Sequence, residues 1–145
     1  MSNLFEIAVA FRTAIEEAVR AGEIREMNTF PRGCCSYASD LLQRYLTEQY
    51  SFYTWYMSGR YGYGWDAESH AWLETEDCLV IDITGDQYAF KKLKFTEPVY
   101  IGSRTDGFHD KFELDEPVAY SRSKDPFGRN REFDRRYEAV IRYLR

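Results

Sequence analysis

The chain has 145 residues, of which 44% are apolar and 17% aromatic, a composition that excludes a disordered protein and predicts one globular domain over residues 1–145. The formal net charge of −5 argues against nucleic acid as the main partner. No stretch approaches the roughly 20 apolar residues of a membrane span, and residues 1–6 lack the basic and apolar pattern of a signal peptide, so no membrane partner is expected.

The first third of the chain predicts two helices. Apolar residues at helical spacing indicate an amphipathic helix from about Asn3 to Ala21. Residues 23–33 form a connector, because the proline and glycine near its end prevent simple continuation of a helix. A second helix then begins near Cys34 or Cys35 and runs to about residue 49.

The remainder predicts strands and a closing helix. Aromatic and β-branched residues favour strands, and a helix with one apolar face is expected around residues 133–144. The order of helix, helix, several strands and helix indicates an α+β fold with an antiparallel sheet, since parallel sheets require alternating strands and helices. The predicted strands cover residues 52–56, 70–74, 78–83, 99–102 and 117–120.

Three cysteines provide candidate nucleophiles. Cys34 and Cys35 are adjacent and could pair only through a strained ring, so reduced thiols and a cytoplasmic location are expected. A helix N-terminus stabilises a thiolate and lowers its pKa, and the free N–H groups there could bind an oxyanion. The alternative is that both are small buried apolar residues. Cys78 lies near a predicted turn, where no catalytic role is expected.

His70 and Asp82 lie on two neighbouring predicted strands. If residues 75–77 form a three-residue turn, His70 lies directly opposite Asp82, on the same face of the sheet. The carboxylate could then hold one ring nitrogen and leave the other free as a base. A one-residue slip would turn Asp82 to the opposite face, and the alternative is a solvent-facing aspartate on a half-exposed strand.

These residues resemble the transglutaminase-like branch of the papain-like superfamily. Members place a cysteine at the start of a helix, a histidine in a His-Ala-Trp-Val-Glu strand and an aspartate in a Val-Asp-Pro-Thr strand. The counterparts here are His70-Ala71-Trp72-Leu73-Glu74 and Ile81-Asp82-Ile83-Thr84, with Ile83 where proline is common. The resemblance covers about residues 30–88, and it implies a papain-like fold and a Cys-His-Asp triad. Leader peptidases of lasso-peptide biosynthesis carry a similar set.

The identity of the nucleophile depends on the residues that come after each cysteine. The family has small and apolar residues three, four, six and seven positions after its cysteine, a spacing that fits Cys35, whereas from Cys34 it would place Asp40 at a core position. In papain a glutamine of the oxyanion hole precedes the cysteine by six residues, and Asn28 stands six before Cys34. We choose Cys35.

The resulting hypothesis is a hydrolase or acyltransferase acting on amide bonds of a peptide or protein substrate. Cys35 attacks as a thiolate, His70 is the base, Asp82 orients His70, and neither a metal nor an organic cofactor is implied. Protease, deamidase, transglutaminase and amidase activities remain open. Trp65 and Trp72 are candidates either for a substrate groove or for the core. His109 lies in a predicted loop, and no catalytic role is expected for it.

Two other functions remain open. One is a noncatalytic binding module on the same fold. Another is an interaction protein that uses its basic C-terminal helix, because residues 121–145 carry eight Lys/Arg and four Asp/Glu. A zinc site from Cys34, Cys35, Cys78 and His70 is disfavoured, since no C-x-x-C pair exists and adjacent cysteines chelate poorly.

Overall fold

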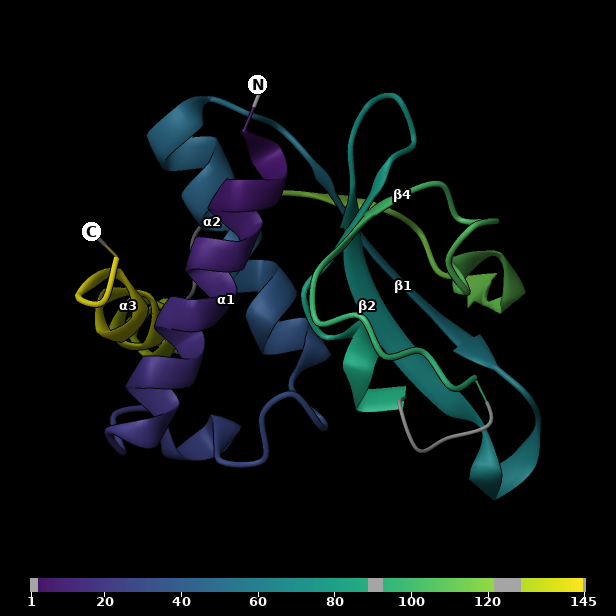
Figure 1. The fold of residues 1–145 in the computed structure, drawn as a ribbon, viewed down its shortest axis with the longest axis horizontal. Helices are drawn as coiled ribbons and strands as arrows, with labels where there is room; N and C mark the ends of the chain where they lie inside the picture. The colour runs from purple at the N-terminus through teal and green to yellow at the C-terminus, as the bar shows by residue number, and fades with distance from the viewer. Residues whose placement is uncertain (1–2, 89–92, 122–128, 145) are drawn as a thin grey trace.

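Three helices form one layer of the computed structural model, which describes residues 3–88, 93–121 and 129–144. Helix α2 lies against the sheet, and α1 and α3 pack beside it (Figure 1). Their buried residues recur at helical spacing, so the apolar periodicity of the sequence directs each helix to this common core. The helices span α1 (Leu4–Arg20), α2 (Cys35–Tyr50) and α3 (Arg129–Ile141).

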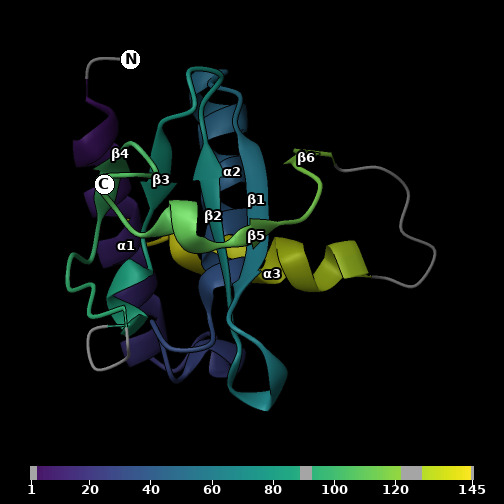
Figure 2. The same ribbon diagram turned by 90° about the vertical axis from the view of Figure 1, so that its right-hand side faces the viewer.

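The second layer is an antiparallel sheet, which confirms the predicted α+β class. The strand order is β4-β3-β2-β1-β5, and β6 also pairs with β1. Figure 2 shows β1 and β2 running side by side in front of α2. The strands span β1 (Trp55–Tyr61), β2 (Glu68–Glu74), β3 (Val80–Asp82), β4 (Tyr100–Gly102), β5 (Glu113–Leu114) and β6 (Val118–Ala119).

Each face of the sheet is covered by a different apolar cluster. Leu73 and Ile81 pack into the core that the three helices share. Trp72 and Val80, their neighbours along the same strands, belong to a second cluster with Tyr88 and two phenylalanines of residues 108–112. Because successive residues of a strand point to opposite faces, β2 and β3 contribute to both clusters. The second cluster is rich in aromatic rings, and it surrounds the buried part of the candidate site.

The turn between β2 and β3 corrects the predicted hairpin register. Glu74 pairs with Val80 and Leu73 with Ile81, so Asp82 continues opposite Trp72 and not opposite His70. The turn contains five residues instead of three: Thr75 N–H donates to the carbonyl of Leu79 over 2.9 Å, and Cys78 adopts a positive φ of 65°. Because the shift is two residues, Asp82 still lies on the same face as His70, as a diagonal neighbour.

Three arginines near the C-terminus, two in α3 and one directly after it, make ion pairs within the molecule. Arg135 and Arg136 both contact Glu26 in the connector after α1, and Arg142 lies 3.7 Å from Glu23. These contacts attach the C-terminal part of the chain to the connector after α1. They also pair three of the positive charges on which the interaction-protein hypothesis depends with carboxylates of the same molecule. Among the described helices, none combines the length and apolar character required to cross a bilayer.

Candidate active site

The start of α2 places Cys35 beside the sheet. Gly33 has a φ of 68°, a conformation that favours glycine, and it turns the chain immediately before the helix. Cys34 occupies the N-cap position and Cys35 is the first helical residue. The N–H groups of a first helical turn have no partner within the helix, so their partial positive charge favours a thiolate at this position.

The two adjacent cysteines lie in different environments. Cys34 is 1% exposed, belongs to the helical core, and has its sulfur 4.0 Å from Thr29 Oγ1. Burial raises the pKa of the Cys34 thiol, whereas Cys35 is partly exposed and lines a cleft of about 560 Å³ together with His70. The structure therefore brings Cys35, and not Cys34, to the site predicted from the sequence. Cys78 is exposed in the β2–β3 turn.

His70 is held by Asp82. His70 Nε2 lies 2.7 Å from Asp82 Oδ2, and both side chains are completely buried. Thr84 N–H donates to the other carboxylate oxygen, Oδ1, over 2.9 Å. The alternative of a solvent-facing Asp82 is wrong: the residue is 1% exposed, and its hydrogen bonds compensate for the cost of burying a charge.

The electrostatics of this pair favour an imidazolium beside a carboxylate. Burial favours the neutral form of His70, but the charge and hydrogen bond of Asp82, followed by Cys35, raise the pKa of His70 to about 9. Burial likewise opposes ionisation of Asp82, and yet its contacts with His70 and His109 lower its pKa below the ordinary value. A buried pair with these opposite shifts is ionised at neutral pH.

The thiol of Cys35 is shifted in the direction that a nucleophile requires. Burial raises its pKa, but hydrogen bonding from His70 and the charge of that ring lower it, as do hydrogen bonds from Ala71 N–H and Gln87. The net pKa lies below the ordinary cysteine value. The arrangement therefore favours a thiolate–imidazolium pair, which is a reactive form of cysteine.

Gln87 is part of this site, although it was not among the residues predicted from the sequence. It lies in the short 3-10 helix η3 (Gly85–Tyr88), and its Nε2 is 3.1 Å from His70 Nδ1. Gly33 N–H donates to its Oε1 over 3.3 Å, which directs the NH₂ group toward the imidazole and thiol. Next to it, Asp86 accepts two hydrogen bonds of 2.6 and 2.8 Å from buried Arg12 of α1. No local pattern indicated this role, because the anchor lies 74 residues away in the sequence.

Asn28 does not take the position suggested by its distance from Cys34. It lines a neighbouring hollow with Phe30, Pro31 and Asp86, which adjoins the Cys35 cleft at Gln87, but Asn28 is not among the described residues that line that cleft. The amide close to Cys35 and His70 belongs instead to Gln87, which follows the aspartate strand rather than preceding the cysteine.

The second histidine also contacts the aspartate. His109 begins the 3-10 helix η4 (His109–Lys111), is completely buried, and has its Nε2 2.6 Å from Asp82 Oδ2. The predicted loop is therefore wrong at this residue, which begins a short helix, while the absence of a catalytic role for His109 stays a prediction. The aspartate–glycine composition around it predicts a loop, and only the tertiary structure places its ring on Asp82.

The two tryptophans considered for a substrate groove do not line the cleft. Trp72 is fully buried beneath the sheet, and its indole N–H donates to Glu74 over 2.9 Å. Trp65 is 99% exposed in the loop between β1 and β2. Small residues such as Ser58, Gly59 and Ser69 line the cleft instead, together with larger polar side chains that include Tyr56 and Arg60.

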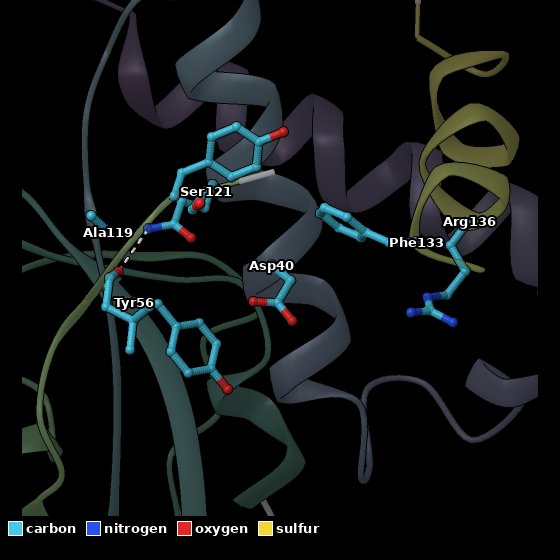
Figure 3. Close-up of a pocket in the computed structure, with 9 residues that line it drawn as sticks. Asp40, Tyr56, Ala119, Ser121, Phe133 and Arg136 are labelled. Atoms are coloured by element: carbon cyan, nitrogen blue, oxygen red, sulfur yellow. Dashed lines mark hydrogen bonds between the residues drawn. The ribbon is translucent and has the colours of Figure 1, made fainter. Parts of the chain in front are cut away.

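A second cavity, of about 460 Å³, adjoins the first at Tyr56, which lines both. Figure 3 shows Asp40 of α2 together with Phe133 and Arg136 of α3 around it. No cysteine or histidine is among the described residues that line this cavity. It therefore offers neither a thiol nor an imidazole base, and the Cys35 cleft, which has both, is the candidate site for chemistry.

Among the described residues, one group of side chains has the composition of a metal site, and no cysteine belongs to it. The ligand atoms of His70, Asp82 and His109 lie within 4.8 Å of one another. The predicted alternative of Cys34, Cys35, Cys78 and His70 is not assembled among the described residues, since Cys34 is in the core and Cys78 is exposed. The nitrogen–oxygen distances of 2.6 and 2.7 Å are hydrogen-bond lengths, whereas ligands each about 2 Å from one zinc ion lie farther apart.

Comparison of the chain with protein-family models, with curated proteins and with solved structures gave no match. Function is therefore inferred from the geometry and chemistry of the site.

Proposed function

We propose that this chain is a thiol-dependent hydrolase or acyltransferase that acts on amide bonds of peptides or proteins. One observation carries the proposal: Cys35 opens into a cleft beside His70, and a buried carboxylate, Asp82, holds the far side of the same imidazole. This arrangement supports the roles of nucleophile for Cys35, base for His70 and orienting group for Asp82, which covalent catalysis of this kind requires.

The proposed reaction proceeds through an acyl-enzyme. The Cys35 thiolate attacks the carbonyl carbon of the amide, and a C–S bond forms. As the tetrahedral intermediate collapses, the C–N bond breaks and the proton on His70 Nδ1 passes to the leaving amine. Water or a primary amine then attacks the thioester, His70 accepts its proton, and the released thiolate again faces an imidazolium. Asp82 stays ionised throughout.

Gln87 is suited to stabilise the oxyanion. Its NH₂ group lies 3.1 Å from His70 Nδ1, and Gln87 lines the same cleft as Cys35, so this amide is close to the point of attack. The free N–H groups at the start of α2 supply further donors. Donors that are fixed before the reaction stabilise developing charge without having to reorganise.

The layer arrangement supports the finer assignment to a papain-like, transglutaminase-like fold. A helix that begins at the nucleophile packs on an antiparallel sheet, and the histidine and aspartate come from neighbouring strands β2 and β3. This is the arrangement that the sequence resemblance implies. The lining of the cleft combines small residues with the charged Arg60 and Asp115, and such groups can contact the polar N–H and C=O groups of a peptide.

The direct test is product analysis with a defined set of peptides. Synthetic peptides that contain glutamine are incubated with the chain, with and without a primary amine, and analysed by mass spectrometry. Shorter peptides indicate hydrolysis, conversion of glutamine to glutamate indicates deamidation, and an amine adduct indicates acyl transfer. We expect one of these products from the unmodified chain and none from Cys35→Ala. Equal product from both chains would overturn the proposal.

A further inference from the structure

Asp82 accepts hydrogen bonds from two imidazoles at a single oxygen. His70 Nε2 and His109 Nε2 lie 2.7 and 2.6 Å from Asp82 Oδ2, while Thr84 N–H donates to Oδ1. Three donors thus fix the orientation of the carboxylate, and only one of them belongs to the proposed triad. Of the other two donors, Thr84 follows Asp82 closely in the chain, whereas His109 comes from a distant segment.

The His109 ring is fixed in place from several sides. It stacks on Phe108 and Tyr100, with ring centroids 4.2 and 5.7 Å apart, and it meets the edge of Trp72 at 4.8 Å. Its segment is tied to β2 by Arg104, which donates two hydrogen bonds of 2.7 and 2.8 Å to buried Glu74. The position of His109 is therefore set before any substrate binds.

Packing alone does not explain a histidine here. The Nδ1 atom of His109 is buried and has no hydrogen-bond partner among the described residues. A buried polar atom without a partner destabilises the folded state, and a phenylalanine would fill the same aromatic surroundings without that cost. What a phenylalanine lacks is the Nε2–H group that faces Asp82.

We propose that His109 is a positioning residue, which holds the Asp82 carboxylate so that its Oδ2 keeps His70 aligned with Cys35. This inference rests on the proposed function, and it adds His109 to the proposed triad of Cys35, His70 and Asp82. His109 touches neither the cleft nor the reacting atoms. It acts through the carboxylate, and the hydrogen on its ring resides on Nε2.

The test compares two substitutions of His109 by a measurement that requires no substrate. His109→Gln places an amide that can still donate to Asp82, whereas His109→Phe keeps an aromatic ring and removes the donor. The rate of alkylation of Cys35 by iodoacetamide is measured against pH in the full chain, with circular dichroism as the control for folding. His109→Phe is expected to slow alkylation at neutral pH roughly 10- to 100-fold, the range for losing a hydrogen bond to a charged group, and His109→Gln to stay within a few-fold.

Three results would overturn the inference. One is a folded His109→Phe chain with the unmodified pH profile, and another is His109→Gln impaired as strongly as His109→Phe. The third is stoichiometric zinc in the purified chain that is lost in either variant, because the cluster would then be a metal site. An unmodified chain in which Cys35 has ordinary reactivity would instead refute the proposed function itself.

If His109→Phe does not fold, nitrogen NMR of the unmodified chain tests the inference by showing which ring nitrogen of His109 carries the proton. The chain has only two histidines, and His109→Gln leaves one, so the signals of the two rings can be assigned by difference. The inference requires a hydrogen-bonded proton on His109 Nε2. A proton found on Nδ1 alone would overturn it.

Discussion

The two sides of the His70 ring differ in the way they are built. On the Asp82 side every group is buried, and the ring lies among Trp72, Tyr88 and Phe108, with centroids 5.1 to 5.6 Å away. On the Cys35 side the ring faces a cleft lined by small and polar residues. The closed side fixes the imidazole and raises its pKa, while the open side leaves room for a substrate.

The difference shows which groups of such a site must be held in fixed positions. A carboxylate in an apolar cluster interacts strongly with a cation, because little water screens the attraction. Burying that charge is costly, however, unless hydrogen bonds satisfy the carboxylate. The open side can tolerate solvent, since the helix N-terminus and Gln87 supply donors of fixed position. Substitutions on the two sides are therefore expected to lower turnover for different reasons: loss of the alignment of His70 on the Asp82 side, and loss of an oxyanion donor on the Cys35 side.

The largest effect is expected at the nucleophile. Cys35→Ala should abolish both product formation and labelling in the cleft, because no other described thiol lies there. The matched control is Cys34→Ala, which removes a buried sulfur from the core and should lower the free energy of unfolding by roughly 1 kcal/mol while keeping activity within a few-fold. Full activity of Cys35→Ala, measured with the same peptides, contradicts the assignment.

Asp82→Asn should reduce turnover roughly 10- to 1000-fold while the fold is retained. The asparagine NH₂ group would face imidazoles that donate to a carboxylate in the native chain, so His70 can take the wrong tautomer. Circular dichroism and turnover are measured on the same preparation. Asp110→Asn, at an exposed carboxylate next to His109, is the control and should stay within about twofold. A folded and fully active Asp82→Asn chain would remove Asp82 from the triad.

Gln87→Ala tests the open side, and we expect it to lower turnover roughly 10- to 100-fold. This loss is smaller than that for a sole oxyanion donor, because the N–H groups of α2 remain. Asn28→Ala is the matched control: it removes the other nearby amide, which lies outside the cleft, and should change turnover less than about twofold. Reversed effects in these two variants would move the oxyanion site to Asn28.

The smallest effect is a change in how stability depends on pH. Between pH 6.5 and 9, folded His70 keeps a proton that the unfolded chain has lost, so its contribution to stability falls as pH rises. Cys35 has a lowered pKa in the folded chain and contributes the opposite slope over the range below its ordinary value. In the unmodified chain, the contributions of His70 and Cys35 to the pH dependence of the unfolding free energy have opposite signs. In Cys35→Ala only the contribution of His70 remains.

Relative to the unmodified chain, Cys35→Ala should therefore lose roughly 1 kcal/mol of unfolding free energy per pH unit over part of this interval. Urea unfolding of both chains at several pH values measures the difference, and the comparison cancels the titration of groups common to both. Parallel pH dependences would show that Cys35 and His70 do not form an ion pair.

Local patterns in the sequence predicted the elements that carry Cys35, His70 and Asp82. Helical periodicity placed α1 within one residue at each end, and the apolar run after Cys35 predicted α2. Alternation and aromatic content indicated β2 and β3. The two-residue strand β5 was not predicted, because so short a segment forms a strand only by pairing with Gly59 and Arg60 of β1.

The contacts that complete the site depend on long-range packing. The β2–β3 turn was predicted two residues too short, because nothing in the sequence marks Cys78 for a positive φ. The position of Gln87 follows from the Arg12–Asp86 ion pair, and that of His109 from aromatic stacking. No single segment carries such information, so the sequence predicted Cys35, His70 and Asp82 as candidates but missed the residues around them.

The central claim is that Cys35 is an activated thiolate paired with His70, and competitive alkylation within one chain tests it most directly. Cys34 is buried, Cys35 lines the cleft and Cys78 is exposed, so each serves as a reference for the others. Limited iodoacetamide treatment near pH 7 is followed by mass spectrometry of the labelled peptides. Labelling of Cys35 before the more exposed Cys78 is the predicted result. Labelling of Cys78 first, with Cys35 reacting only at alkaline pH, would contradict the account.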